Sequence, residues 1–181
     1  MVASDGQEHI AGMVSQAIAG DELAFARIVA AHQDDLSRVA YVISRDTDIA
    51  QEAVQETWAI CWRQLPRLRD PGRLRPWLVA ICANQARQAM RRARRRTVVE
   101  FDVNEAASRS PHAGTDAWAR DLDLRNALAR LSPDDRALLA MRYVAGLDST
   151  ELAHHSGISA SGTRARLARL LAGLRKELDH V

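Results

Sequence analysis

Apolar residues recur every three or four positions through most of the chain, which is the spacing of amphipathic α-helices. The pattern runs from Asp21 to about Arg96, stops, and resumes from about Arg120. Aromatic residues make up only 4% of the chain, so a core has to be built mostly from Leu, Ile, Val and Ala. A β-sandwich is disfavoured, because strands are enriched in aromatic and β-branched residues. The sequence therefore predicts an all-α fold.

Residues 97–119 interrupt this helical pattern. Ser, Pro, Gly, Asn and Asp collect there, and no apolar stripe persists. A segment of this length without regular structure is unusual inside a compact domain. We therefore predict two small helical domains, residues 20–96 and 120–181, joined by a flexible linker over residues 97–119. Residues 1–19 are assigned to an N-terminal tail.

Four helices are expected in the first domain. The third begins near Asp46 or Asp48, either of which can cap a helix. Proline and glycine residues predict a loop over residues 65–76. The fourth helix is expected to run from Trp77 into a run of arginines at residues 91–96.

Charge is distributed unevenly along the chain. The formal net charge is +2 overall, but it is −7 over residues 1–62, +9 over 63–100, −3 over 101–157 and +3 over 158–181. Lys176 is the only lysine, so nearly all of the positive charge is guanidinium, which suits bidentate contacts to phosphate and guanine. Two basic segments separated by acidic ones favour nucleic-acid binding. The alternative is that they are solvated helix faces.

The segment Leu147–Leu174 has the pattern of a helix-turn-helix. Asp148 and Glu151 have capping-box spacing for a short helix, a turn follows at residues 156–159, and a longer basic helix comes next. In this motif the second helix lies in the major groove with its N-terminal residues at the base edges. The residues placed to contact DNA are Ser161, Thr163, Arg164 and Arg166, with Arg169 nearer the phosphates. An ordinary helical hairpin with a polar outer face is the alternative.

Arginines on the fourth helix form a second candidate DNA surface. They cover more than one helix face, which suits contact with a phosphate backbone, and they are Arg87, Arg91, Arg92, Arg94, Arg95 and Arg96.

A third candidate surface is acidic. Glu52, Gln55 and Glu56 are three and four residues apart, so they share one face of the third helix. Val54, Trp58 and Trp62 are expected to point away from this face into the core. The surface is either a solvated helix face or a docking site for a basic protein partner.

Several classes of protein are disfavoured by the sequence. No run of 18 apolar residues and no secretory signal is present, so we expect a cytoplasmic protein without membrane insertion. Cys61 and Cys82 are expected to be buried thiols, with a redox role left open. His154 and His155 are adjacent and make a poor metal pair. We expect no cofactor, no metal and no enzymatic activity, because no phosphate loop or nucleophile–base arrangement is visible.

Three stretches resemble bacterial RNA polymerase sigma factors of the extracytoplasmic-function (ECF) group. Asp48–Trp62 resembles the helix that binds core polymerase. Trp77–Asn84 with its following basic residues resembles the helix that engages the −10 promoter element. Ala127–Arg136 and the helix-turn-helix resemble the domain that recognises the −35 element. The resemblance implies a protein that binds core polymerase through its β′ and β subunits, directs it to promoter DNA and helps to open the DNA.

The resemblance also implies roles for individual residues. Glu52, Gln55 and Glu56 would contact the β′ subunit. Asn84, Arg87, Arg91 and Arg92 would face the −10 element, together with the loop at 65–76. Ser161, Thr163, Arg164, Arg166 and Arg169 would face the −35 element. An anti-sigma factor is a further implied partner.

Two other functions remain open at this point. A stand-alone helix-turn-helix regulator would bind operator DNA without polymerase, but it needs neither the acidic face nor the basic fourth helix. An adaptor that binds only proteins would leave both groups of arginines unexplained. The recognition helix departs from the family pattern at Thr163 and Ala165, so the −35 sequence is not predicted.

Overall fold

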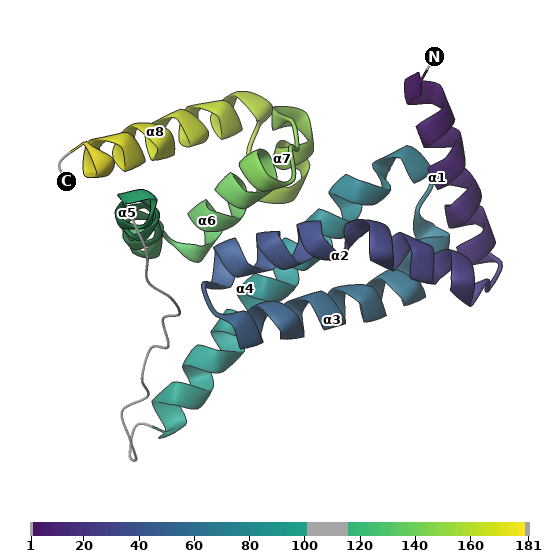
Figure 1. The fold of residues 1–181 in the computed structure, drawn as a ribbon, viewed down its shortest axis with the longest axis horizontal. Coiled ribbons are helices and arrows are strands. Elements are labelled where there is room, and N and C mark those ends of the chain that lie inside the picture. Colours follow the sequence, from purple (N-terminus) through teal and green to yellow (C-terminus); the bar gives the residue numbers. More distant parts are fainter. Residues whose placement is uncertain (1, 101–115, 180–181) are drawn as a thin grey trace.

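The computed structural model describes residues 2–100 and 116–179, with the side chains of residues 10–96 and 123–179. These parts of the chain are almost entirely helical and contain no β-strand (Figure 1). The helices are α1 (Val2–Ile18), α2 (Glu22–Ser44), α3 (Thr47–Gln64), α4 (Leu74–Glu100), α5 (Asp116–Arg130), α6 (Pro133–Leu139), α7 (Ser149–Ser156) and α8 (Ala160–Leu178). The described residues also form three short helical turns: the 3-10 turns η1 (Leu65–Arg67) and η2 (Pro71–Arg73) and the π-helical turn η3 (Ala140–Val144).

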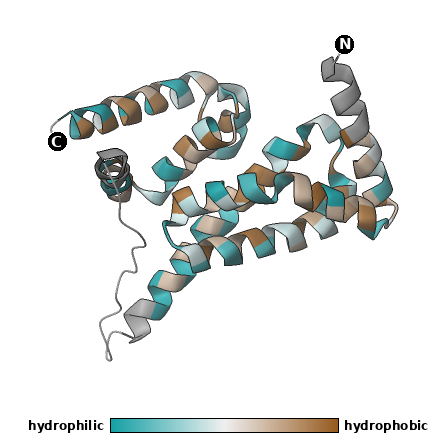
Figure 2. Ribbon diagram, in the orientation of Figure 1, coloured by the Kyte–Doolittle hydropathy of each residue, from teal (hydrophilic) through white to brown (hydrophobic). Residues whose placement is uncertain are grey.

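The first domain is built on α2, α3 and α4, which pack against one another. Asp21 caps α2 by accepting hydrogen bonds from the amides of Leu23 and Ala24, and Asp46 caps α3 through the amide of Ile49. Apolar residues of all three helices are buried in one core. The hydropathy colouring shows apolar and polar residues interspersed along each of these helices (Figure 2). The expected all-helical domain is confirmed.

The segment assigned to an N-terminal tail contains a helix, α1. This helix packs against α2 and against the turns η1 and η2. Val14 and Ala17 are buried in that contact. From the sequence, residues 1–19 were expected to lie outside the first domain.

The loop expected at residues 65–76 contains the turns η1 and η2, and α4 begins inside it at Leu74. Pro76 lies in the first turn of α4, where backbone N–H groups make no hydrogen bond within the helix. Proline, which has no N–H, is therefore tolerated there, and the helix starts at Leu74, three residues before Trp77. Trp62 also differs from its expected core position. Its side chain is 41% exposed and packs against Phe25, with ring centroids 4.8 Å apart at an interplanar angle of 69°.

The second domain contains α5 to α8. Ser132 caps α6 through the amide of Asp135, and Pro133 occupies the first helical position. The helix-turn-helix is formed by α7 and α8. Asp148 and Glu151 form the expected capping box at α7. Gly157 ends α7 in the left-handed conformation with φ 69°, which glycine adopts readily. Ser159 then caps α8.

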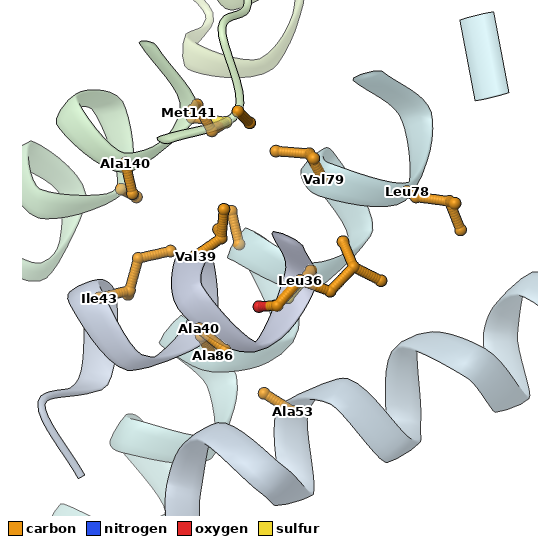
Figure 3. Close-up of a cluster of buried hydrophobic side chains, with 14 of the residues drawn as sticks. Leu36, Val39, Ala40, Ile43, Ala53, Leu78, Val79, Ala86, Ala140 and Met141 are labelled. Carbon is orange, nitrogen blue, oxygen red and sulfur yellow. The ribbon is translucent and has the colours of Figure 1, made fainter. Parts of the chain in front are cut away.

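The two domains pack against each other and share one apolar core. Val39 and Ile43 of α2 and Val79 of α4 face Ala140 and Met141 of the second domain (Figure 3). All five side chains are almost completely buried. The sequence predicted the two domains but not this contact, because a period of 3.6 residues shows which face of a helix is buried and not against what.

Arg136 of α6 fastens the contact between the domains. Its Nε donates to the carbonyl oxygen of Ile43 at the end of α2, at 2.7 Å, and its Nη1 donates to the carbonyl oxygen of Leu131 at 2.9 Å. The residue is buried. Burial, and after it the charges of Arg45 and Arg94, lowers the pKa of Arg136. One guanidinium thus satisfies carbonyl groups from both domains.

We expect Arg136→Ala to lower the free energy of unfolding by about 2–4 kcal/mol, because buried carbonyl oxygens lose a charged donor. Arg130→Ala is the control, since Arg130 is exposed and its distance to Glu177 is 3.7 Å, and it should change stability by less than about 0.5 kcal/mol. Urea denaturation followed by circular dichroism measures both. Equal stability of the two variants would contradict the role of Arg136.

We expect Gly157→Ala to lower the free energy of unfolding by about 1 kcal/mol, because an L-residue is strained in the left-handed region. No atom lies within 4 Å of a Cβ built on Gly157, so the effect comes from the backbone alone. Gly157→Asn should cost less, since asparagine tolerates this conformation. The same urea titration ranks the variants, and a larger loss for asparagine than for alanine would contradict the explanation.

Candidate DNA-binding and protein-docking surfaces

The exposed side of α8 carries most of the residues expected to contact DNA. Ser161, Arg164 and Arg169 are exposed. The hydroxyl groups of Ser161 and Ser159 are 3.0 Å apart, so Ser161 is held at the start of the helix. Guanidinium groups on an exposed helix that follows a tight turn are the arrangement by which a helix-turn-helix contacts DNA.

Thr163 requires a correction. Its side chain is 0% exposed, so it does not reach DNA from this position. Thr163 lies one turn before Leu167, which is also buried, and its hydroxyl group is 3.5 Å from that of Ser156. Thr163 therefore packs α8 against α7, and the sequence pattern did not separate this inner position from the outer positions beside it.

Arg166 is partly exposed and paired within the second domain. Its Nε and Nη2 lie 2.8 Å and 2.7 Å from Oδ1 of Asp135 on α6. Ser132 donates its hydroxyl hydrogen to the other oxygen of the same carboxylate, at 2.7 Å. Asp135 thus holds the side chain of Arg166, one of the residues of α8 expected to contact DNA, in an ion pair. The sequence pattern places Asp135 at the start of a helix but gives no sign of this ion pair.

The four side chains expected at the −10 element lie on α4, where two are exposed and two form ion pairs. Asn84 and Arg91 are exposed. Arg87 is 23% exposed, and its Nη1 lies 2.9 Å from Oδ1 of Asp134 in the second domain. Arg92 donates from Nη2 to Oε1 of Glu52 on α3, at 2.8 Å. The exposed pair is free to reach a ligand, whereas Arg87 and Arg92 are engaged by carboxylates.

The acidic face of α3 divides between its two neighbouring helices. Glu52 pairs with Arg92 of α4, and Glu56 is exposed. Gln55 lines a hollow of about 380 Å³ between α2 and α3, beside Tyr41 and Trp58. Of the predicted patch, only Gln55 therefore lines this groove with its aromatic wall.

Gln33 orients the aromatic wall of this groove. Its side-chain oxygen accepts a hydrogen bond from the indole Nε1 of Trp58 at 2.6 Å. The other face of Trp58 meets Phe25 edge-on at 6.1 Å. Trp58 is thus only partly buried, between the core and the groove, and not wholly in the core as expected. Nothing in the sequence pattern indicated that Gln33 and Tyr41 share a hollow with Gln55.

A polar cavity of about 230 Å³ lies where the two domains meet. It is lined by Arg87 and Asp134, by His155 and Ser156 of α7, and by Arg166. Arg87 Nε is buried there without a hydrogen-bond partner. Burial, and after it the charges of His154 and Arg87, lowers the pKa of His155. One arginine from each candidate DNA surface therefore lines the same cavity.

The two cysteines are buried, as expected from the sequence. Cys61 and Cys82 are buried, and desolvation raises the pKa of each thiol to about 12, which disfavours the reactive thiolate. Among the described residues, no group of three or more His, Cys, Asp or Glu side chains could hold a metal ion. None of the described helices is long and apolar enough to cross a membrane.

Curated proteins similar to this chain are sigma factors. The "Probable RNA polymerase sigma factor RfaY" of Xanthomonas campestris pv. campestris is 32% identical over 171 residues, which are 90% of this chain and 42% of that protein. This chain thus spans less than half of that relative. The "ECF RNA polymerase sigma factor SigL" of Mycobacterium tuberculosis is 28% identical, over 93% of this chain and 96% of that protein.

Solved structures with the same fold include two complexes. CnrH in complex with the cytosolic domain of CnrY has a TM-score of 0.67 at 24% identity, over 93% of this chain and 96% of that chain. The sigma factor RpoE in complex with the anti-sigma factor NepR from Bartonella quintana has a TM-score of 0.68 at 22% identity, over 86% and 96%. At these identities the comparison establishes the fold.

Family models cover both domains. Sigma-70 region 2 matches residues 28–96, which include α3 and the arginines of α4. Sigma-70, region 4 matches residues 121–173, which include the helix-turn-helix. The two matches occur in the order and at the places that the fold assigns to its two domains. The chain therefore belongs to the sigma-70 family, and relatives that match it over most of their length are named ECF RNA polymerase sigma factors.

Proposed function

We propose that this protein binds core RNA polymerase, directs it to a set of promoters and helps to open the DNA there. The observation that carries the proposal is that two separate arginine-rich DNA surfaces and one acidic docking face occur on one chain that matches both sigma regions. A single DNA-binding module needs only one of these surfaces. The chain has no catalytic role in this proposal, because polymerase supplies the chemistry, and it works in the cytoplasm, where polymerase and DNA are.

The docking face for polymerase is formed by Glu52, Gln55 and Glu56 with the groove between α2 and α3. Gln55 and Glu56 are exposed, and the hollow beside them is walled by Tyr41 and Trp58. The exposed carboxylate of Glu56 on the same helix as a groove with glutamine and aromatic lining suits a helix of the β′ subunit that carries basic and apolar residues. Aromatic side chains with a polar atom are enriched at such interfaces.

The −10 surface consists of Asn84, Arg87, Arg91 and Arg92 on α4. Asn84 and Arg91 are exposed and can contact DNA directly. Capture of an unstacked base of the opened strand would explain how a protein without catalytic groups favours melting, since binding offsets the cost of unstacking. The arginines that follow at residues 94–96 are exposed along the same helix and suit the phosphate backbone.

The −35 surface consists of Ser161, Arg164, Arg166 and Arg169 on α8. Residues at the start of a recognition helix contact base edges, and later ones contact phosphates. Arg166 lies between these positions, and in the isolated protein it is paired with Asp135. Thr163 is not part of this proposal, because its side chain is buried.

An anti-sigma factor is proposed as a further partner. The neighbouring structures of CnrH and RpoE are complexes with the cytosolic domain of CnrY and with the anti-sigma factor NepR. The shared fold supports a partner of the same kind for this chain. Such a partner would compete for the groove or for the DNA surfaces.

Footprinting with and without core polymerase separates this function from that of a stand-alone regulator. We expect a specific footprint over both promoter elements only when polymerase is present. Tight, sequence-specific protection by the isolated protein at physiological salt would support the stand-alone regulator instead.

We expect the double variant Glu56→Lys with Gln55→Ala to weaken binding to core polymerase a hundredfold or more. Loss of a charged contact with added repulsion at an interface costs about 2–5 kcal/mol. The control is Asp179→Lys, which makes the same charge reversal at the exposed end of α8. Titration of labelled protein with core polymerase measures affinity, and circular dichroism verifies folding. Unchanged affinity in a folded double variant would show that this face is only solvated.

We expect Arg166→Ala to lose about 1–3 kcal/mol of specific binding and to relax preference at one −35 position. Arg169→Ala should instead weaken all sequences alike, as loss of a phosphate contact does. Selection from randomised −35 sequences with the reconstituted holoenzyme measures both. Unchanged sequence preference for the Arg166 variant would contradict its assignment to a base edge.

A further inference from the structure

Two consecutive carboxylates at the start of α6 hold one arginine from each candidate DNA surface. Asp134 accepts from Arg87 Nη1 of α4 at 2.9 Å. Asp135 accepts from Nε and Nη2 of Arg166 on α8 at 2.8 Å and 2.7 Å. In Figure 1, α6 lies between α8 on one side and the helices of the first domain on the other. The polar cavity lined by Arg87, Asp134 and Arg166 marks the same place.

These contacts have the chemistry of DNA recognition. Arginine binds phosphate and guanine through the same N–H groups that it offers to a carboxylate. A carboxylate that holds these N–H groups therefore excludes a phosphate or a base edge from them. The fold positions the carboxylates firmly: Asp134 and Asp135 lie in the first turn of α6, where the helix dipole favours negative charge, and Ser132 donates to Asp135.

We propose that Asp134 and Asp135 act as an internal competitor that keeps the isolated protein from binding DNA. The inference rests on the proposed function, because it assumes that Arg87 and Arg166 contact promoter DNA. Arg87 is released when the domains separate, since Asp134 belongs to the other domain. Arg166 and Asp135 belong to the same domain, so their ion pair remains after the domains separate. It is replaced by a contact between Arg166 and DNA when the −35 element binds.

Promoter spacing requires that separation. Elements named −10 and −35 are 25 base pairs apart, and at about 3.4 Å per pair their centres are about 85 Å apart. A compact chain of 181 residues has a radius of gyration of about 16 Å, hence a diameter of about 40 Å. The packed arrangement therefore cannot contact both elements at once. The ion pair between Arg87 and Asp134 is broken before both are bound.

The test measures how the isolated full-length protein binds a 30-base-pair duplex without promoter sequence, by fluorescence anisotropy over a range of salt concentrations. We expect Asp134→Asn with Asp135→Asn to bind about 3- to 25-fold more tightly, because each of the two competing ion pairs is worth up to about fivefold. The slope of log K against log salt should steepen by up to about 1.8, because two more phosphates are neutralised.

The control removes the same two charges elsewhere. Asp34→Asn with Asp179→Asn changes two exposed carboxylates on α2 and at the end of α8 that hold none of the candidate DNA-binding arginines. If this control gains as much affinity as the double variant of α6, the gain is only an effect of net charge and the proposal fails. A gain well above the control supports it.

A mutant cycle ties the effect to the two arginines. In protein that carries Arg87→Gln and Arg166→Gln, the two asparagine substitutions on α6 should add no more than the control does. A full gain in that background would overturn the proposal, because the carboxylates would then act without their partners.

Asp134→Asn alone serves as a second variant, since Asp134 is 64% exposed and can be changed without loss of packing. It should give part of the gain, and Arg87→Gln should cancel that part.

Failure of the internal-competitor proposal can be distinguished from failure of the proposed sigma-factor function. Polymerase-dependent transcription by the unsubstituted protein tests the sigma role by itself. Transcription without a gain from the α6 variants would remove the internal competitor and leave the sigma role intact.

Discussion

The guanidinium group of Arg136 is the contact on which the arrangement of the two domains depends. It reaches from α6 to the last turn of α2 and binds carbonyl oxygens that helix geometry leaves unpaired. The apolar contact of Val39, Ile43 and Val79 with Ala140 and Met141 forms around it. A buried cation held by carbonyl groups has few alternative positions, so it fixes the register of α6 against the first domain. That register in turn sets where Asp134 meets Arg87.

The side chains proposed to bind DNA and the side chains that hold the fold together are neighbours in the described part of this protein. Arg75 pairs with Asp35 and also donates to the carbonyl oxygen of Ala145, so it links the domains from the other end of the interface. Arg92 joins the candidate DNA surface of α4 to the candidate docking face of α3 through its ion pair with Glu52. A protein with nearly all of its positive charge on arginine can form such planar, directional pairs, whereas lysine would give looser contacts.

Much of the fold was predictable from the sequence, because the signals were local. The capping box of α7, the cap of α6 and the glycine turn depend on residues within four positions of one another. The predicted exposure of Thr163 and the predicted burial of Trp58 and Trp62 differ from the structure, because each depends on what packs against the helix. α1 was missed as part of the domain, although Val14 and Ala17 are buried. The role of Asp134 and Asp135 was invisible, because their partners are 47 and 31 positions away.

The length of α4 sets how the second domain is tethered. This helix has 27 residues and at about 1.5 Å per residue is about 40 Å long. Among the residues of α4 whose side chains are described, the last buried one is Met90, and the end of the helix extends beyond α3 (Figure 1). Whatever path residues 101–115 take, they reach at most about 55 Å from that end. This segment therefore starts at the end of α4 that carries the exposed arginines 94–96. A deletion of about ten residues would shorten the reach to about 20 Å, so the length of this segment limits which promoter spacings the protein can serve.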